Sequence, residues 1–436
     1  MKLAGWGNFP RMSCRVATLG AADEAQSWLD QPPMIARGLG RSYGDAALQP
    51  NLTLLTRRLD HILAFDPVTG LLSCEAGVTL ETILDVFLPR GWLPPVSPGT
   101  KFVTLGGMVA ADVHGKNHHK AGSFGGHVRS LRLMLADGRV VECGPDVEPE
   151  LFWATIGGMG LTGLILSVSF HLLPVHTAFI RSEVLCAPNL EAAFDAFEAS
   201  AGWTYTVAWI DCLTGGRNLG RCLLTRGELA EPDELPPGLL PRRKRPKRVP
   251  VDLPNWVLNR WSMRAFNTLY YNMAPAKPRP AIMDLDSFFY PLDALLEWNR
   301  IYGRNGFTQY QCVLPKPAGR EGLRHLLATI QKSGFGSFLA VLKLFGGHAG
   351  GCLSFPMEGY TLALDFPVRP PTLALLHELD AIVADHAGRL YLAKDARTTP
   401  GMLRKGYPRL VGFQHIRDQW GATGRMQSLL AERLDL

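Results

Sequence analysis

Short apolar segments with a two-residue period mark the first part of the chain and predict strands. The segments with this pattern are 34–36, 52–56, 70–76, 130–136, 140–142 and 164–170. Asp137-Gly138 lies between two of them and predicts a hairpin turn, because such a pair accepts positive φ angles. Helices are expected over 23–29, 79–88 and 148–155, and Thr79 supplies a hydroxyl that suits a helix cap.

Beyond Pro174 the pattern changes to longer strands and helices without long glycine loops. Residues 308–314, 338–344 and 360–366 are predicted to form three strands of one antiparallel sheet. An amphipathic helix over 371–387 and a last strand over 390–395 follow. The fold class is therefore α+β: a glycine-loop domain, a sheet domain and a C-terminal return.

Three glycine-rich loops interrupt the first domain, and the longest of them covers Pro98 to Ser130. The other two are Arg37–Asp45 and Gly157–Gly163. Glycine lets a ligand touch bare backbone, and runs of backbone N–H groups bind anions. The loops thus favour a large anionic cofactor laid against the chain, with a long surface loop as the alternative. Glycines at this density argue against a helix inside the longest loop.

Several common motifs are absent or misplaced. Gly158-Met-Gly-Leu-Thr-Gly163 matches GxGxxG, but an expected helix precedes it and a strand follows, the reverse of a dinucleotide fold. No phosphate-binding GxxxxGK[ST] motif and no nucleophile elbow occur. His114 and His118 would share a metal only on a helix, which the neighbouring glycines disfavour, so no metal site is predicted.

Composition sets wider limits. The 436 residues are 47% hydrophobic and 19% charged, typical of a globular protein of two or three domains. Eight scattered cysteines without a CxxC pair favour a reducing, cytoplasmic location. No signal-peptide core or membrane-spanning run is recognised. The net charge of +6 is concentrated in the basic run Arg242–Arg248.

The loops carry a family resemblance. The matching motifs are RGLGRSYGD at 37–45, HGKNHH at 114–119, AGSFG at 121–125, ELFWAT at 150–155 and AKDARTT at 393–399. With further matches they extend from residue 37 to about 400, and they resemble the FAD-binding domain of the vanillyl-alcohol-oxidase type. More narrowly, the chain is similar to the oxidase subunits of decaprenylphosphoryl-β-D-ribose 2′-epimerases.

The resemblance implies a two-part FAD-binding domain, 1–177 and 389–436, around a substrate domain built on an antiparallel sheet with helices, 178–388. It implies non-covalent FAD, because Ser42 and Tyr43 stand where some relatives carry a flavin-linked histidine. The implied FAD contacts are Gly38, Leu39, Gly40, Arg41, Ser42, Tyr43, Pro98, Gly99, Thr104, Gly106, Gly107, His114, Asn117, Gly122, Ile165 and Tyr391.

The resemblance also implies catalytic groups, with Lys394 as the candidate base and His114 and Tyr43 as other proton carriers. A counter-charge role is the alternative for Lys394. The implied substrate contacts are Lys116, Gln309, Gln311, Lys343, Thr361, Ala363 and Lys394. Phe289, Ala363 and Thr361 replace a tyrosine, a cysteine and an asparagine of actinobacterial members.

The implied reaction is oxidation of the 2′-hydroxyl of a polyprenyl-phosphoryl pentose to the 2′-keto sugar, the first half of an epimerisation toward the arabinose form. A separate NAD(P)H-dependent keto-reductase would finish it, and quinone or oxygen would take the electrons. A flavin oxidase of a soluble alditol or aldonolactone is the alternative enzyme, and a polyanion-binding protein is the alternative without catalysis. Nucleic acid is not expected.

A lipid-linked substrate also predicts peripheral contact with a membrane. The basic run and the aromatic residues that follow it, within Arg242–Pro280, are the candidate segment. An interfacial helix is expected over Asn255–Tyr271, with a solvated insertion over the pocket as the alternative.

Overall fold

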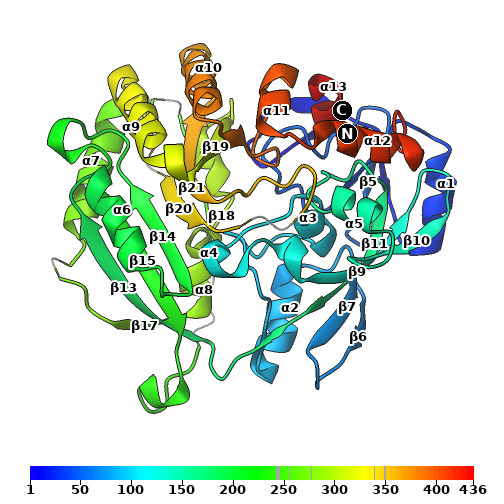
Figure 1. Ribbon diagram of the computed structural model, residues 1–436, viewed down its shortest axis with the longest axis horizontal. Coiled ribbons are helices and arrows are strands. Elements are labelled where there is room, and N and C mark those ends of the chain that lie inside the picture. Colours follow the sequence, from blue (N-terminus) through cyan, green and yellow to red (C-terminus); the bar gives the residue numbers. More distant parts are fainter. Residues whose placement is uncertain (242–245, 255, 276, 338, 348–349) are drawn as a thin grey trace.

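The computed structural model describes residues 1–241, 246–254, 256–275, 277–337, 339–347 and 350–436. Its first half centres on a five-stranded antiparallel sheet in the order β10-β9-β11-β7-β6 (Figure 1). The strands are β6 (Ile62–Phe65), β7 (Leu71–Glu75), β9 (Val128–Met134), β10 (Val140–Cys143) and β11 (Leu164–His171). The predicted hairpin joins β9 and β10, whose register pairs Met134 with Val140.

A three-stranded parallel sheet in the order β3-β5-β4 flanks the first sheet. Its strands are β3 (Val16–Thr18), β4 (Ile35–Arg37) and β5 (Thr53–Leu55), and the first glycine loop begins where β4 ends. The helices of this half are α1 (Gln26–Leu29), α2 (Leu80–Phe87), α3 (Leu105–Ala110), α4 (His118–Ala121) and α5 (Pro149–Thr155). The predicted cap is confirmed, because the Thr79 hydroxyl accepts a hydrogen bond from Thr82 N at 3.0 Å.

The second half is an eight-stranded antiparallel sheet in the order β17-β13-β15-β14-β20-β21-β19-β22. The strands are β13 (Phe179–Ala187), β14 (Tyr205–Ile210), β15 (Cys222–Leu229), β17 (Ala281–Asp284), β19 (Phe307–Pro315), β20 (Ala340–Phe345), β21 (Gly359–Pro367) and β22 (Arg389–Leu390). The predicted three-stranded antiparallel unit is confirmed as the adjacent strands β20, β21 and β19. Phe338, the predicted first residue of β20, lies outside the described residues.

Helices cover the outer face of this sheet and bury its apolar side chains. They are α6 (Leu190–Ala199), α7 (Arg260–Asn272), α9 (Lys316–Ser333) and α10 (Pro370–Asp385), while α8 (Leu285–Phe289) packs against β17. Three short strand pairs lie outside these sheets: β1 (Lys2–Ala4) with β2 (Arg11–Ser13), β8 (Trp92–Leu93) with β12 (Leu173–Pro174), and β16 (Lys247–Arg248) with β18 (Leu295–Leu296).

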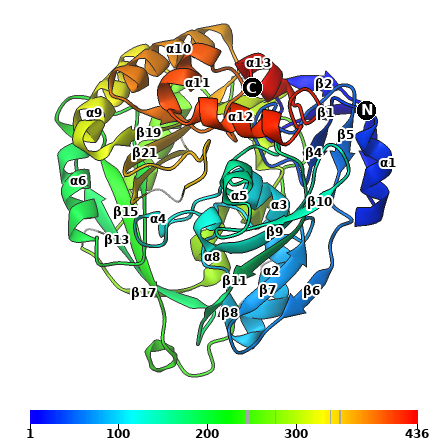
Figure 2. The same cartoon turned by 45° about the vertical axis from the view of Figure 1, so that its right-hand side comes forward.

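The chain then returns to its first half through α11 (Pro400–Gly406), α12 (Leu410–Gln419) and α13 (Leu429–Leu434). Figure 2 shows these helices beside the N-terminal strands, and Met34 forms a parallel bridge with Met426. The mixed α/β architecture predicted from the sequence is thus confirmed. The boundaries at 177 and 388 stay a prediction, which this return of the chain supports.

Two local predictions were wrong. The longest glycine loop contains two short helices, α3 and α4. The Thr104 hydroxyl accepts from Gly107 N at 3.3 Å and caps the first turn of α3. The last strand ends at Leu390 rather than at residue 395. Tyr391 O accepts hydrogen bonds from the backbone N–H groups of Lys394, at 3.0 Å, and Asp395, at 3.1 Å, so the segment closes into a turn.

Candidate active site

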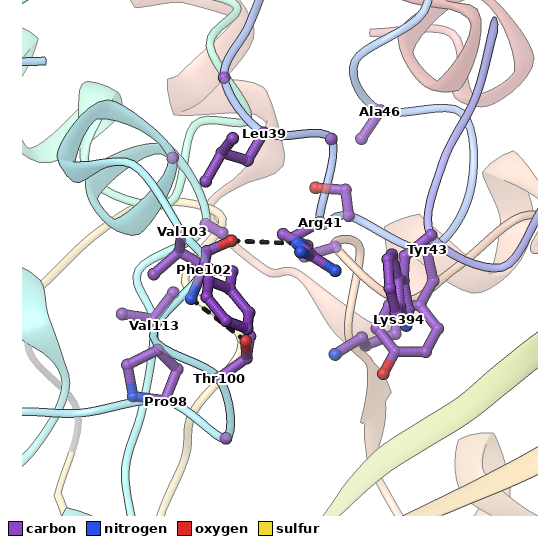
Figure 3. Close-up of a pocket in the computed structure, with 18 of the residues that line it drawn as sticks. Leu39, Arg41, Tyr43, Ala46, Pro98, Thr100, Phe102, Val103, Val113 and Lys394 are labelled. Carbon is purple, nitrogen blue, oxygen red and sulfur yellow. Dashed lines mark hydrogen bonds between the residues drawn. The ribbon is translucent and has the colours of Figure 1, made fainter. Parts of the chain in front are cut away.

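The first glycine loop leaves a run of backbone donors without protein partners. Among the described residues, none accepts a hydrogen bond from the N–H groups of residues 38–42. Gly40 has a φ of 66°, a left-handed conformation that favours glycine. Successive free N–H groups form an anion-binding concavity. The Arg41 side chain points from this loop toward Phe102 and donates through Nε to Phe102 O at 3.1 Å (Figure 3). Its guanidinium also stacks on the Trp6 ring.

The second wall is the segment from Pro98 to α3. Asp293 fixes its tip, because the carboxylate accepts from Lys101 N at 2.8 Å and from Thr100 Oγ1 at 2.7 Å. Thr104 then starts α3, whose first turn places Gly106 and Gly107 on the wall without side chains. This segment therefore gives a flat ligand close access to the backbone.

Between these loops and the sheet lies a cavity of about 340 Å³. Every predicted FAD contact except Asn117 and Gly122 lines it, as does every predicted substrate contact except Lys116. The loops form one side, and β19, β20, β21 and the turn after β22 form the other. The fold thereby places Gly38 and Lys394, which are almost 360 positions apart in the sequence, in the wall of the same cavity.

Lys394 lies at the junction of the two halves. Its Nζ is 3.7 Å from the centre of the Tyr43 ring, and the two side chains lie together in Figure 3. Burial lowers the pKa of Lys394 to about 7, against the opposing effect of the Asp365 charge. An amine with this pKa is partly neutral near pH 7 and can accept a proton.

Asp365 was not predicted as a site residue, although it shares a strand face with Thr361 and Ala363. Its Oδ1 accepts from Gln309 Nε2 at 2.6 Å, and its Oδ2 accepts from Tyr302 Oη at 3.2 Å. Burial raises the pKa of Asp365 to about 7. The two-residue period of β21 places Asp365 on the same face as two predicted site residues, so Asp365 could have been identified from the sequence.

His114 and Gln311 form a second polar group in the cavity wall. Gln311 Nε2 is 3.1 Å from His114 Nε2 and 3.3 Å from Thr361 Oγ1. Burial, and then the charge of Lys343, hold the pKa of His114 well below its usual value, so the ring is neutral at pH 7. His114 Nδ1 is buried and has no hydrogen-bond partner in the described part of the chain. An orphaned polar atom in a cavity wall fits a polar ligand.

Two further lysines, Lys343 and Lys116, are half-buried near the same sheet face. Burial lowers the pKa of Lys343, which lines the cavity, to about 8. Burial and the Lys343 charge lower the pKa of Lys116 to about 7. Lys116 turns into the protein instead, where Nζ contacts Phe288 O and lies 4.3 Å from the centre of the Phe288 ring.

Three predicted residues, Asn117, Gly122 and Lys116, do not line the cavity. Asn117 Nδ2 donates to Pro95 O at 2.8 Å, and Gly122 ends α4 with a φ of 69°. Lys116 is described above, and the roles of all three stay predictions. Residues of the segment 292–298 also line the cavity and were not among the predicted site residues, although the family resemblance extends over this segment. Across the described residues, no group of three or more His, Cys, Asp or Glu side chains is placed to hold a metal ion.

The cavity fits FAD in two ways. The free N–H groups of residues 38–42 and the Arg41 guanidinium suit a pyrophosphate, and the glycine-lined wall admits a flat ring. The chain is thus a flavin-dependent oxidoreductase in class. Residues 25–144 match the family model described as an FAD binding domain.

Comparison of this sequence with known proteins identifies its family within the flavin-dependent oxidoreductases. The chain is 38% identical over 461 aligned positions to decaprenylphosphoryl-β-D-ribose oxidase of Mycolicibacterium smegmatis, covering 100% of this chain and 97% of that one. It belongs to the family of FAD-dependent oxidases that contains this enzyme. An uncharacterized protein in the mprA 5′ region of Streptomyces coelicolor is 35% identical over 82% of this chain and 100% of its own length. Mitochondrial D-2-hydroxyglutarate dehydrogenase of Bos taurus is 30% identical over only 36% of this chain and 30% of its own length.

Proposed function

We propose that this enzyme oxidises the 2′-hydroxyl of a polyprenyl-phosphoryl pentose, resembling decaprenylphosphoryl-β-D-ribose, to the 2′-keto sugar. The observation that carries the proposal is a half-buried, weakly basic amine, Lys394, in the wall of the cavity that also holds the free N–H groups of residues 38–42. The substrate class is supported by the relative that matches this chain from end to end.

Oxidation of an alcohol to a ketone removes a hydride from carbon and a proton from oxygen. Bound FAD would accept the hydride. Lys394 in its neutral form accepts the hydroxyl proton, and the Asp365 carboxylate stabilises the resulting ammonium. Gln309 and Tyr302 keep that carboxylate in place through their hydrogen bonds.

The other two predicted proton carriers are less suited to act as the base. Burial raises the pKa of Tyr43 well above its ordinary value. The phenol therefore stays protonated at neutral pH and cannot act as the base that accepts the hydroxyl proton. His114 is neutral and can accept a proton, but its low pKa makes it a weak base. We assign both to orientation of the substrate or the flavin.

Lys343 is the group we assign to the substrate phosphate. Its pKa of about 8 leaves most of it charged at pH 7, and it lines the cavity beside Thr361 and Ala363. An ammonium binds phosphate as a point charge and requires no fixed orientation.

The proposal also includes a reductase that acts on the product and an acceptor for the electrons. A keto sugar would be consumed by a separate NAD(P)H-dependent keto-reductase, and quinone or oxygen would reoxidise the enzyme. A polyprenyl chain would hold the substrate in a bilayer, so we also propose peripheral contact with a membrane. No helix in the described residues is long and apolar enough to cross one. The cytoplasmic location stays a prediction.

An anaerobic titration tests the substrate. Prenyl-phosphoryl pentoses, including a short-chain soluble analogue, are added to the holoenzyme while the oxidised flavin band is followed. We expect bleaching with prenyl-phosphoryl ribose and none with free ribose, alditols or aldonolactones. Bleaching by a free alditol or lactone alone would replace the proposal with the soluble-substrate alternative.

A second measurement tests how the cofactor is held. No histidine occurs in the loop 37–45, so acid precipitation should release the FAD into the supernatant. Flavin colour that stays with the denatured protein would contradict non-covalent binding.

A further inference from the structure

Helix α7 turns an apolar stripe toward solvent. Trp261, Ala265, Leu269 and Met273 recur every four residues, and all four are exposed. The exposed fractions of Trp261, Leu269 and Met273 are 74%, 62% and 74%. Side chains spaced by four residues lie along one face of a helix. A surface helix ordinarily turns such a stripe toward the core, so this helix is oriented the opposite way.

The opposite face of α7 is firmly attached to the protein. Met263 and Asn267 are buried, and Asn267 Nδ2 donates to the buried Asp211 carboxylate at 2.8 Å. Arg221 adds a hydrogen bond to Thr268 Oγ1 at 3.3 Å. A buried polar anchor of this kind fixes the rotation of the helix about its axis. The buried contacts of the opposite face therefore hold the apolar stripe toward solvent.

The segment that contains the stripe carries mostly positive charge. Residues 246–280 carry six Lys or Arg side chains and one acid, Asp252. That acid forms an ion pair with Arg300 at 3.2 Å. Arg260 and Arg264 on the helix itself are exposed. An apolar stripe bordered by cations is complementary to an anionic lipid surface, which offers negative head groups over an apolar interior.

The segment that leads into α7 contacts the cavity wall. The segment before α7 pairs its strand β16 with β18, whose residues Leu295 and Leu296 line the cavity. Leu258 packs against the cluster that contains Tyr43 and Trp298, two more lining residues. Figure 1 places α7 at the outer edge of the sheet half.

We propose that α7 docks this enzyme on anionic bilayers through Trp261, Leu269 and Met273, with Arg260 and Arg264 meeting the head groups. The proposal rests on the proposed function only in that a lipid-linked sugar is met at a bilayer. The predicted docking segment, Arg242–Pro280, is thereby narrowed to α7. Arg242–Arg245 of the basic run, and Asn255 of the predicted helix, lie outside the described residues.

Co-sedimentation of the holoenzyme with vesicles tests the proposal. The wild type should bind mixed phosphatidylglycerol–phosphatidylcholine vesicles, bind phosphatidylcholine vesicles less, and be released by high salt. The variant W261S/L269S/M273S should lose at least about tenfold in vesicle affinity, because its apolar anchor is gone. R260Q/R264Q should lose affinity mainly for the anionic vesicles. Melting temperature and FAD content verify that each variant is folded.

A matched control replaces exposed valines far from α7. Val68, Val147 and Val411 are 88%, 56% and 77% exposed, and V68S/V147S/V411S should bind vesicles like the wild type. Equal binding by the α7 variant and the wild type would overturn the proposal. So would a wild type that ignores vesicles, or one that forms dimers which W261S/L269S/M273S dissolves, since the stripe would then bind a second copy.

Failure of the proposed function is separable from failure of the docking site. Sedimentation uses no substrate, so it succeeds or fails whichever sugar bleaches the flavin. Oxidation of a short-chain soluble analogue by the α7 variant should equal that of the wild type. A loss of that activity together with unchanged vesicle binding would place the stripe at the substrate site and overturn the docking role.

Discussion

At the scale of single residues, the site depends on how burial changes the pKa of two opposite groups. Lys394 and Asp365 interact inside the protein, and burial brings the pKa values of both to about 7. Neither value follows from residue type, because in water the amine would be charged and the acid ionised. The pair therefore titrates as one system near neutral pH.

Replacement of Lys394 tests the base directly. We expect Lys394→Met to keep FAD but to reduce the rate of substrate-driven flavin reduction by about 10²–10⁴-fold, as for other positioned proton acceptors. Rapid-mixing absorbance under anaerobic conditions measures this rate. A wild-type rate would contradict the assignment, and loss of FAD would point to the counter-charge role instead.

Replacement of Asp365 tests the coupling through pH. The negative charge of Asp365 raises the pKa of Lys394, so its removal in Asp365→Asn should lower that pKa below about 7. Because the neutral amine is the active form, the rising limb of the flavin-reduction rate should move to lower pH. A pH series of the same rapid-mixing measurement detects the shift. A limb that stays in place or moves upward would show that Asp365 does not act on Lys394.

At the scale of elements, two helices with the same kind of start have different roles. Thr79 and Thr104 cap α2 and α3 with nearly identical φ and ψ angles, −92° and 152° against −91° and 152°. The two threonines also form a bridge with each other. Only Thr104 lines the cavity. A comparison of the two caps can therefore distinguish an effect on helix stability from an effect on FAD binding.

This pair gives a matched prediction. Thr104→Ala and Thr79→Ala should each lower the free energy of unfolding by about 1 kcal/mol, the usual effect of losing a cap. Only Thr104→Ala should weaken FAD retention, because its cap holds Gly106 and Gly107 against the cavity. Thermal unfolding and FAD titration of the apoprotein measure the two effects. Equal FAD affinity in both variants would contradict a role for the α3 start.

At the scale of the whole molecule, the C-terminal return is joined to the first glycine loop by one arginine. Arg433 Nη2 lies 2.9 Å from Asp45 Oδ1 and 2.9 Å from Asp395 Oδ2, and Nη1 donates to Thr398 O at 2.6 Å. Asp45 ends the loop 37–45, and Asp395 follows Lys394. The network therefore joins the C-terminal helix α13 to the first glycine loop and to the turn that carries Lys394.

Loss of this arginine should destabilise the whole fold. Arg433→Met leaves two buried carboxylates without their cation, which typically reduces stability by about 3–5 kcal/mol. Burial already raises the pKa of Asp45, and loss of Arg433 raises it further. The folded state then favours the protonated acid, so the defect should shrink as pH falls and grow as pH rises.

Denaturant unfolding at several pH values measures this effect. The control is Arg320→Met, which removes an exposed cation from Glu198 and should change stability by at most about 1 kcal/mol. A pH-independent defect in Arg433→Met, or one no larger than the control, would contradict the network.

The sequence by itself determined the α+β class, the antiparallel unit of β19, β20 and β21, the Thr79 cap and the FAD-binding loops. These features are encoded locally, by two-residue or helical periods, caps and glycine-rich motifs. The sequence also marked Lys394 through its motif.

Only the tertiary structure decided how these parts act together. Helix α3 forms despite its glycines because a cap and neighbouring packing outweigh propensity. Asp365 becomes a partner of Lys394, and Lys116 turns away from the cavity, because burial and charge proximity depend on residues distant in sequence. The hydrogen bond between Asn267 and Asp211 sets the direction in which the apolar stripe of α7 faces. A helical period in the sequence shows that an apolar face exists, but it does not show whether that face points to the core or to solvent.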